Sequence, residues 1–486
     1  MFLIINLGLK SIRGIVFSNT GKKIYSENYN IQTNISGEFI EQDPYQYKKL
    51  FFKIIENLKK KGITKRIKYI STTTSSGCLL LLDKKKSPCS KVITILDARC
   101  KKLSYNLNKK EKNLFKHEMQ LVKVLWFKKN KNKIFKKSKY WLNNGDYLNM
   151  LLTNKIFTDE LNYRKFFIKN NSFTNKFIKE YGLRKECLPK KINIGKMLNL
   201  DQKIKKKFNF HFEAKLIVTT YDAICATIGS INNRFPENNA SEVSGTVTSV
   251  RAITKKKPKK IKNLQIAYIP LIRRYFIGAS NNLGGGIFEW YKKFLPGNGN
   301  YKNIEISYSK SKENIFFLPL LFGDRYLGID SISQGLFYGI GRSTNINDLT
   351  KGVVESSALI TKLLINDIEE AGIKIKSITL SGGLARLKFV NFVKYEIYRK
   401  KTFLCKEFES TSLGCLILML ASIKKDSFEK IIKIIKTKEI KREYNLTLKE
   451  NRNKLNKFKD LIIYLKKFLK KNQTTDIKSR KILYNL

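Results

Sequence analysis

The chain begins with two apolar stretches that are separated by polar residues and glycine. Residues 3–5 and 15–17 are β-branched, leucine or phenylalanine, and Gly8 and Ser11 lie between them. Because apolar runs of this kind favour strands and Gly and Ser favour turns, the pattern predicts strand, turn and strand. Such a turn is ordinarily a plain hairpin, but its exposed backbone N–H groups can also cradle a phosphate. The local pattern leaves both alternatives open.

The same alternation continues along the N-terminal half of the chain. Short apolar runs in "IKYISTTT" and "GCLLLLD" predict strands, whereas "YQYKKLFFKIIENLKKK" has the spacing of an amphipathic helix. A Lys-rich and mainly helical region is expected from residue 101 to about residue 206. After it, "EAKLIVTTYDAICATIGS" predicts a buried strand that runs into a helix. The alternation of strands and helices indicates an α/β fold.

The composition changes at "NNRFPENNASE", which is rich in Asn, Pro, Glu and Ser and is typical of a domain boundary. Beyond it, "EVSGTVTSVRAIT" repeats the apolar, turn, apolar pattern of the N-terminus. The C-terminal segment has the pattern of basic amphipathic helices, for which packing on the body of the protein is favoured over membrane docking. We therefore predict an N-terminal domain over residues 1–236, a C-terminal domain over 237–424 and a basic helical extension over 425–486.

Charge and composition exclude several classes of protein. The formal net charge is +57, but Lys is spread over the whole chain together with Asn and Ile, so we predict no specific nucleic-acid site, which normally appears as a patch or stripe. The seven cysteines include no C-x-x-C pair, and the chain has two histidines, which argues against a disulfide framework, a zinc site and a His-based triad. The longest late apolar run, "LGCLILMLA", is too short to span a membrane. We expect a cytoplasmic protein without membrane attachment.

Candidate chemistry lies in the glycine-containing turns and in one aspartate. The turns "NLGLKS", "VSGTVTS", "LGGG" and "LSGGLAR" match neither the P-loop nor the Rossmann pattern. Asp222 follows an apolar strand and precedes small residues at the predicted start of a helix. A carboxylate in this position is often a helix cap, but it can also be held to take a proton from an alcohol.

Taken in order, these segments resemble the FGGY carbohydrate kinases, a family of the actin and hexokinase-like ATPases. Each motif alone is weak, but their common order along almost the whole chain is not expected by chance. The segments that carry the resemblance are "LIINLGLKSIRGIVFSNTG", "GEFIEQDP", "ITILDARCKK", "YDAICATIGS", "VSGTVTS", "NIFFLPLLFGDRYLG", "GVVESSALI", "LSGGLARLKFV" and "EFESTSLGCLILMLAS". The resemblance implies an α/β protein of two actin-like (ribonuclease H-like) domains with the active site in the cleft between them.

The resemblance also implies ATP and Mg²⁺ as cofactors and assigns roles to residues. Asp222 would be the general base, and Asn6 would bind the metal through water. Arg13 is either structural or a phosphate ligand. The residues implied to bind ATP are Asn6, Gly8, Lys10, Ser11 and Arg13 in the first phosphate loop, Gly245 and Thr246 in the second, and Gly382, Gly383 and Arg386 near the adenosine.

The implied acceptor is a small sugar or polyol, and its identity stays open. The segment that contacts sugar in the family corresponds to "TTTSSGCLLLLD", in which Ser75 and Ser76 are substrate candidates or a solvent-facing turn. Asp97 and Arg99 are either substrate-side residues or a structural ion pair. The sequence does not give the oligomeric state, and a homodimer is one alternative.

Departures from the family pattern leave a second reading open. Asn6 stands where the family has Asp, Leu9 where it has Thr, and Ile95 where it has Trp. Ser356 replaces a Gly and Asp324 replaces a Glu. An amide in place of a carboxylate can still hydrogen-bond a metal-bound water, but it brings no charge. An active kinase is favoured, and the alternative is a catalytically silent relative that binds sugar or polyanions.

Overall fold

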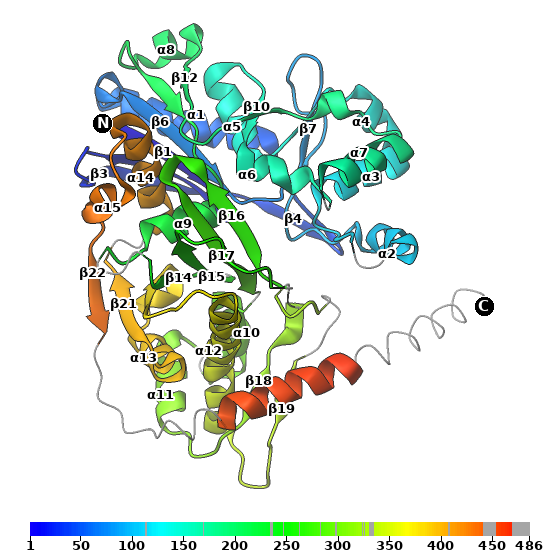
Figure 1. Cartoon of the computed structure of the whole chain (residues 1–486), viewed down its shortest axis with the longest axis vertical. Coiled ribbons are helices and arrows are strands. Elements are labelled where there is room, and N and C mark those ends of the chain that lie inside the picture. Colours follow the sequence, from blue (N-terminus) through cyan, green and yellow to red (C-terminus); the bar gives the residue numbers. More distant parts are fainter. Residues whose placement is uncertain are drawn as a thin grey trace. The chain divides into compact units, whose positions relative to one another are not determined.

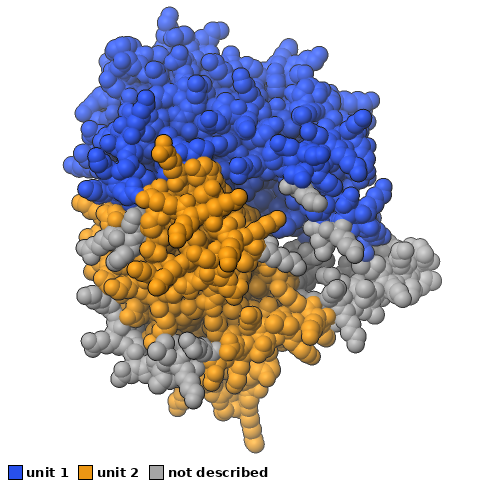
Figure 2. All heavy atoms as spheres, in the orientation of Figure 1, with its two compact units in different colours: residues 1–229, 269–272, 409–434 blue, residues 230–268, 273–408, 435–486 orange. Residues whose placement is uncertain are grey.

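The computed structural model divides the chain into two compact units (Figure 1). Unit 1 comprises residues 1–229, 269–272 and 409–434, and unit 2 comprises 230–268, 273–408 and 435–486 (Figure 2). The sequence predicts three domains that are each continuous in the chain, with boundaries at 236/237 and 424/425, and these boundaries stay a prediction. The structure describes residues 1–111, 114–168, 170–233, 237–245, 247–261, 263–281, 283–296, 299–322, 324, 326–329, 335–406, 409–440 and 453–468.

Unit 1 is built on a six-stranded sheet in the order β12-β13-β6-β1-β2-β3. The central strands β13, β6 and β1 are parallel, whereas β2, β3 and β12 run antiparallel to their neighbours. The strands are β1 (Phe2–Leu7), β2 (Ser11–Phe17), β3 (Lys23–Asn30), β6 (Tyr69–Thr74), β12 (Met197–Asn199) and β13 (Lys215–Ile217). The predicted strand, turn and strand at the N-terminus is therefore confirmed.

Helices cover both faces of this sheet, which explains why β1 is apolar at nearly every position. Leu3 and Ile5 join the core against α1 (Pro44–Lys60), and Ile4, which points to the other face, is also fully buried. There α14 (Ser410–Lys424) packs against β1 and β6. A sheet that is covered on both sides needs continuous rather than alternating apolar residues. The other helices of this central part are α5 (Asn144–Thr153), α8 (Gln202–Phe208) and α9 (Asp222–Gly229).

Helices α9 and α14 approach each other unusually closely because glycines lie at their contact. A Cβ on Gly229 would lie 1.8 Å from the Ser410 carbonyl oxygen, and one on Gly414 would lie 1.7 Å from the Cys225 carbonyl oxygen. Backbone therefore packs on backbone at both points, and any side chain there would force the helices apart. This contact holds the helix that begins at Asp222 against α14.

A peripheral part of unit 1 has its own hydrophobic core, with Trp141 and Phe166 among its buried members. Its strands are β4 (Thr33–Ser36), β5 (Phe39–Gln42), β7 (Leu80–Leu82), β8 (Val92–Ile93), β9 (Tyr140–Leu142), β10 (Phe157–Asp159) and β11 (Lys190–Ile192). Its helices are α2 (Lys101–Lys110), α3 (Gln120–Asn130), α4 (Asn132–Lys137), α6 (Glu160–Tyr163) and α7 (Asn171–Glu180). The Lys-rich region is thus largely helical, as predicted, but short strands interrupt it.

Unit 2 repeats the topology of unit 1. Its seven-stranded sheet has the order β16-β17-β15-β14-β20-β21-β22. As in β3-β2-β1-β6-β13, three antiparallel strands, β17-β15-β14, are followed by two strands, β20 and β21, that are parallel to β14. The strands are β14 (Asn239–Ser244), β15 (Thr248–Thr254), β16 (Gln265–Ile269), β17 (Arg274–Asn281), β20 (Ser377–Ser381), β21 (Lys401–Cys405) and β22 (Thr437–Ile440). This duplication confirms the predicted fold class of two actin-like α/β domains.

The main helix of unit 2 is α12 (Ile346–Glu370), which a capping box of Asn345 and Asp348 starts, and which packs on β15, β17 and β18. The remaining elements are α10 (Gly285–Tyr291), α11 (Tyr301–Ser309), α13 (Lys388–Tyr398), β18 (Phe316–Leu318) and β19 (Leu336–Tyr338). No helix in the described ranges is long and apolar enough to cross a membrane.

The segment that follows α14 is only partly helical. After the short α15 (Phe428–Ile431), residues 437–440 form the edge strand β22 on β21, where the sequence pattern had predicted a basic helix. Residues 453–468, the red helix of Figure 1, place Phe458, Ile462 and Leu465 in the core of unit 2. Residues 441–452 and 469–486 of the predicted extension lie outside the described residues.

Candidate functional site

The predicted first phosphate loop is the turn between β1 and β2. The Gly8 N–H donates to the Ser11 carbonyl oxygen across 2.9 Å, which closes the turn. The carbonyl oxygen of Leu9 accepts from the Gln42 side chain at 2.7 Å, and that of Lys10 accepts from the Ile31 N–H at 2.8 Å. The carbonyl groups are thus used within the protein, while the side chain of Lys10 is exposed.

Asn6 lies on β1, two residues before this turn. Its side-chain oxygen Oδ1 is buried and accepts no hydrogen bond from any described residue. A buried polar atom without a partner is costly and uncommon in folded proteins, so it calls for an explanation. A hydrogen-bond donor from outside the chain, such as a water on a bound metal ion, would satisfy it.

Arg13, the neighbour of Asn6 across the hairpin, is engaged by a residue from the far end of unit 1. Its Nη1 donates to both carboxylate oxygens of Glu409, at 2.7 and 2.5 Å, and its Nε donates to Asn28 Oδ1 at 3.4 Å. Glu409 precedes α14, so the ion pair ties the first hairpin to that helix. These are the contacts of the structural alternative, and a phosphate role for Arg13 stays a prediction.

The Ser75 segment lies beside the first loop. The Ser75 N–H donates to the Leu7 carbonyl oxygen at 3.2 Å, and its buried hydroxyl lies 3.5 Å from Cys78 Sγ. Gly77 has a positive φ of 77°, and a Cβ on it would lie 2.4 Å from Cδ1 of Ile95. Ser76 is half-buried. Of the two predicted serines, Ser76 is therefore the more accessible.

Two side chains of α3 hold this segment from behind, and the sequence analysis did not single them out. Gln120 Nε2 donates to the Cys78 carbonyl oxygen at 2.8 Å. Lys123 is fully buried and donates to the carbonyl oxygens of Gly77 and Thr94, both at 2.8 Å. Burial lowers the pKa of Lys123. The one available signal was the presence of two polar residues, at spacing i and i+3, in the apolar run "QLVKVLWF".

Asp97 and Arg99 form a buried ion pair. Arg99 donates from Nε and Nη2 to the two oxygens of Asp97, at 2.8 and 2.7 Å, and from Nη2 to Glu41 at 2.8 Å. Its guanidinium lies over the rings of Phe39 and Trp126. These contacts match the structural alternative, so a direct role toward substrate stays a prediction.

Asp222 begins α9, five residues after the end of β13 at Ile217. Its Oδ1 accepts from the Ala223 N–H at 2.7 Å, and the residue is half-buried. The preceding chain is fixed to β6, because Thr73 Oγ1 donates to the Thr220 carbonyl oxygen at 2.8 Å and Thr219 Oγ1 donates to the Thr72 carbonyl oxygen at 2.9 Å. Asp222 is therefore held at the carboxyl end of β6.

Three predicted residues thus meet at one edge of the sheet of unit 1. Asn6, Ser75 and Asp222 lie at or beyond the carboxyl ends of β1, β6 and β13, which are neighbouring parallel strands. In open α/β sheets this edge is where ligands bind. Lys10 and Ser11 join it through the first turn. Thr220, which places Asp222, also donates to the buried Asp159 at 2.8 Å, a contact that the sequence analysis missed.

Unit 2 brings its two predicted turns together in the same way. Gly245 follows β14, and its N–H donates to the Val247 carbonyl oxygen at 3.0 Å. Gly382 follows β20, the parallel neighbour of β14, with a φ of 86°, and a Cβ there would lie 2.6 Å from the Ser244 carbonyl oxygen. Glycine is therefore required at 382 by the backbone itself. Arg386 is exposed, and Thr246 lies outside the described residues.

Other glycines of these turns are not required by the protein's own packing. A Cβ on Gly8 would come no closer than 3.7 Å to the nearest atom, and one on Gly245 no closer than 4.0 Å. A Cβ on Gly383 would meet no heavy atom within 4 Å. Open space beside a glycine backbone is what the close approach of a ligand requires. Each of these turns therefore has room beside a glycine for a ligand to approach the backbone.

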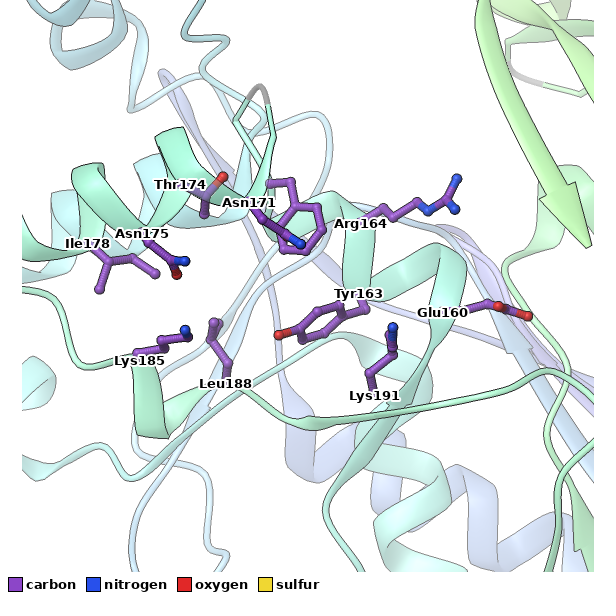
Figure 3. A pocket seen from close by; sticks show the side chains of 11 residues that line it. Glu160, Tyr163, Arg164, Asn171, Thr174, Asn175, Ile178, Lys185, Leu188 and Lys191 are labelled. Atoms are coloured by element: carbon purple, nitrogen blue, oxygen red, sulfur yellow. The ribbon is translucent and has the colours of Figure 1, made fainter.

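A separate hollow of about 450 Å³ lies in the peripheral part of unit 1 (Figure 3). Tyr163, Arg164, Lys185 and Lys191 are among its lining residues, most of which lie in α6, η2 (Arg164–Phe166), α7, η3 (Lys185–Cys187) and β11. None of the predicted site residues that the structure describes lines it.

Comparison with known proteins gives a consistent picture. The model of the N-terminal domain of the FGGY family of carbohydrate kinases matches residues 1–229, and the model of its C-terminal domain matches residues 241–423. The chain is 21% identical to a gluconokinase of Bacillus subtilis over 472 residues, with 89% of each chain covered. It is 22% identical to a xylulose kinase of Lactococcus lactis over 457 residues, covering 88% of this chain and 89% of the other.

Solved structures show the same fold. A ligand-bound xylulose kinase from Lactobacillus acidophilus superposes with a TM-score of 0.83 at 19% identity, over 97% of this chain and 99% of the other. A Plasmodium falciparum glycerol kinase with ADP superposes with a TM-score of 0.80 at 17% identity, over 96% and 98% of the two chains.

Proposed function

Because the chain belongs to the FGGY family of carbohydrate kinases, we propose that it transfers the terminal phosphoryl group of ATP to a hydroxyl of a small sugar or polyol, with Asp222 as the general base. The observation that carries this proposal is the meeting of Asn6, Ser75 and Asp222 at the carboxyl edge of β1, β6 and β13. A phosphate-facing turn, an acceptor segment and a carboxylate are the parts that transfer to an alcohol needs.

In this mechanism Asp222 accepts the proton of the acceptor hydroxyl as the bond to phosphorus forms, because a sugar hydroxyl is too weak an acid to lose it earlier. Its position at the start of α9 supports the ionised form, since the positive end of the helix dipole lies there. The Ala223 N–H at 2.7 Å orients one carboxylate oxygen of Asp222.

The turn after β1 would receive the transferred phosphoryl group. Lys10 and Ser11 would offer backbone N–H groups and the Lys10 ammonium to its oxygens, Gly8 would let the backbone come close to them, and Arg13 stays a candidate ligand. Asn6 Oδ1 would accept a hydrogen bond from a water of a bound Mg²⁺, which would explain why it has no partner among the described residues. When bound, Mg²⁺ supplies neutralisation of phosphate charge.

In unit 2, we assign the nucleotide to the two turns that meet at the Ser244 carbonyl group. Gly245 and Thr246 would contact phosphates, and Gly382, Gly383 and Arg386 would lie near the adenosine. For the acceptor, we propose Ser75 and Ser76 as ligands of its hydroxyl groups, with Asp97 and Arg99 as further candidates. On this basis residues 1–236 form the acceptor domain and residues 237–424 the nucleotide domain.

The test is a coupled assay of ADP release by the wild-type chain with ATP and Mg²⁺ over pentoses, hexoses, ketoses, sugar acids and polyols. We expect one chemical class of acceptor to raise ADP release well above the rate without acceptor. If no acceptor does so while a sugar raises the melting temperature, the chain is a silent sugar-binding relative. Stabilisation by a short duplex alone, and only at low salt, would instead favour a polyanion-binding relative.

A further inference from the structure

A buried ion pair lies directly behind the two nucleotide turns of unit 2. Lys394 Nζ lies 2.5 Å from Glu242 Oε1, and the two residues are 3% and 1% exposed. Glu242 is on β14, the strand that leads into the turn at Gly245, and Lys394 is on α13, the helix that follows the turn at Gly382–Arg386. The pair therefore joins the two elements that carry these turns.

Further hydrogen bonds satisfy both partners. Ser244 Oγ donates to Glu242 Oε1 at 2.6 Å and accepts from Lys394 Nζ at 3.1 Å. The hydroxyl of the fully buried Tyr398 donates to Glu242 Oε2 at 2.6 Å. Burial, followed by the nearby Glu242 charge, raises the pKa of Tyr398, so the phenol stays protonated and keeps donating. Both carboxylate oxygens are thus held in a single arrangement.

The network reaches the backbone of both turns. Ser244, which accepts the lysine hydrogen bond, is also the residue whose carbonyl group faces the Cα of Gly382. Ser381, the residue before Gly382, donates from Oγ to the Glu242 carbonyl oxygen at 3.3 Å. A shift of α13 relative to β14 would therefore break the ion pair and move one turn against the other.

Such a pair is a poor source of stability, because the cost of desolvating two charges offsets their attraction, and apolar residues of similar size are often as stabilising. What directional charged hydrogen bonds do provide is a fixed geometry. Resting on the proposed function, we infer that Glu242, Lys394 and Tyr398 form a clamp that positions the two turns for the nucleotide. They are positioning residues, since they act through Ser244 and Gly382.

The test removes both charges together, so that no unpaired charge is left in the core. The variant is Glu242→Gln/Lys394→Met. The control is Glu369→Gln/Lys400→Met, another Lys–Glu pair of unit 2 with a 2.7 Å contact, which joins the end of α12 to the residue before β21. Calorimetry measures the dissociation constant of ADP with Mg²⁺, thermal unfolding measures stability, and steady-state kinetics measures the acceptor KM.

We expect the clamp variant to bind ADP about tenfold more weakly, the usual effect of losing a supporting hydrogen-bond partner, with the acceptor KM unchanged. The control variant should keep the wild-type ADP affinity. Equal ADP affinity of the wild type and a folded clamp variant would overturn the inference and leave the proposed function standing. If the wild type itself does not bind ADP, the proposed function and the inference both fail.

Tyr398→Phe provides a second test that does not depend on the double variant's folding. It removes one donor to Glu242 and keeps both charges. A weaker ADP affinity at an unchanged acceptor KM supports the clamp. A lower melting temperature with unchanged ADP affinity means that the network is structural only, and overturns it.

Discussion

The ammonium of Lys123, a fully buried residue, donates to the carbonyl oxygen of Gly77 across 2.8 Å. Its other acceptor, the Thr94 carbonyl oxygen, lies three residues before Asp97. Lys123 therefore ties the Ser75–Cys78 segment to the Asp97 segment, the two places that we assign to the acceptor. These two hydrogen bonds also offset the cost of burying the ammonium group, which would be left without partners if they were lost.

We expect Lys123→Met to raise the acceptor KM about tenfold, because the segment loses its support and small displacements of binding groups are costly. The nucleotide KM should not change. Lys128→Met is the control, since Lys128 lies on the same helix and also donates to two carbonyl oxygens, those of Tyr181 and Gly182, at 2.6 and 3.0 Å. Equal acceptor KM values for the two variants would show that the tether does not position the acceptor.

Asp222→Asn tests the general base. The amide keeps the shape and the hydrogen bond to the Ala223 N–H, but it cannot accept a proton. We expect kcat to fall about 10²–10⁴-fold, the usual worth of a positioned base, with little change in ATP affinity. If Asp222 were only a helix cap, the change would cost at most about 1 kcal/mol of stability and leave turnover intact. Steady-state kinetics on the acceptor found in the assay distinguishes the two.

Asn6→Asp tests the metal assignment. The new carboxylate would lie where Oδ1 is now buried with no partner among the described residues, so we expect a lower melting temperature in the absence of Mg²⁺ and recovery when Mg²⁺ and nucleotide are added. The rate should be kept or raised, and the Mg²⁺ concentration for half-maximal rate should fall. A slower enzyme with an intact fold would mean that this loop does not handle the metal. Activity that appears only in the variant would favour the silent alternative for the natural chain.

Gly382 and Gly383 should respond differently to substitution although they are neighbours. Gly383→Val adds its side chain to open space, so the protein should fold while ADP binding is lost. Gly382→Ala would place a Cβ 2.6 Å from the Ser244 carbonyl oxygen at a positive φ, so it should lower the melting temperature itself. Unchanged ADP affinity in Gly383→Val, measured by calorimetry, would remove this turn from the nucleotide site.

Asp146 makes the stability of unit 1 depend on pH. Burial raises its pKa to about 7, although it accepts hydrogen bonds from the Asn143 backbone and side chain at the start of α5. The folded state therefore holds a proton that the unfolded state, with a pKa of about 3.9, has lost. The contribution of Asp146 to the free energy of unfolding is therefore greatest below about pH 4. It falls as the pH rises to about 7 and is constant above that.

Asp146→Asn removes this titration. The melting temperature of the variant should therefore rise relative to that of the wild type as the pH is raised from 5 to 8. If the melting temperatures of the two proteins instead change equally with pH over this range, Asp146 does not titrate there.

Local sequence determined much of the plan of this protein. Apolar runs with short turns specified the strands, the glycine-rich turns marked both loop regions, and Asp222 was placed correctly between a strand and a helix. The order of motifs was enough to identify the family, because each motif depends on residues close together in the chain. The same local reasoning predicted a helix over residues 437–440, where pairing with β21 makes a strand instead.

Tertiary structure alone decided which distant residues meet. Arg13 finds its carboxylate at Glu409, and Glu242 finds its cation at Lys394, 152 residues later. Lys123 looks like one more lysine in a chain with 96 Lys and Arg residues, yet it is buried, because the fold brings two carbonyl groups to it. The free energy of a buried charge depends on partners that are distant in the sequence. The same is true of the need for glycine at position 382, which faces the Ser244 carbonyl oxygen. These partners, and with them the support of the site, exist only once both units have folded.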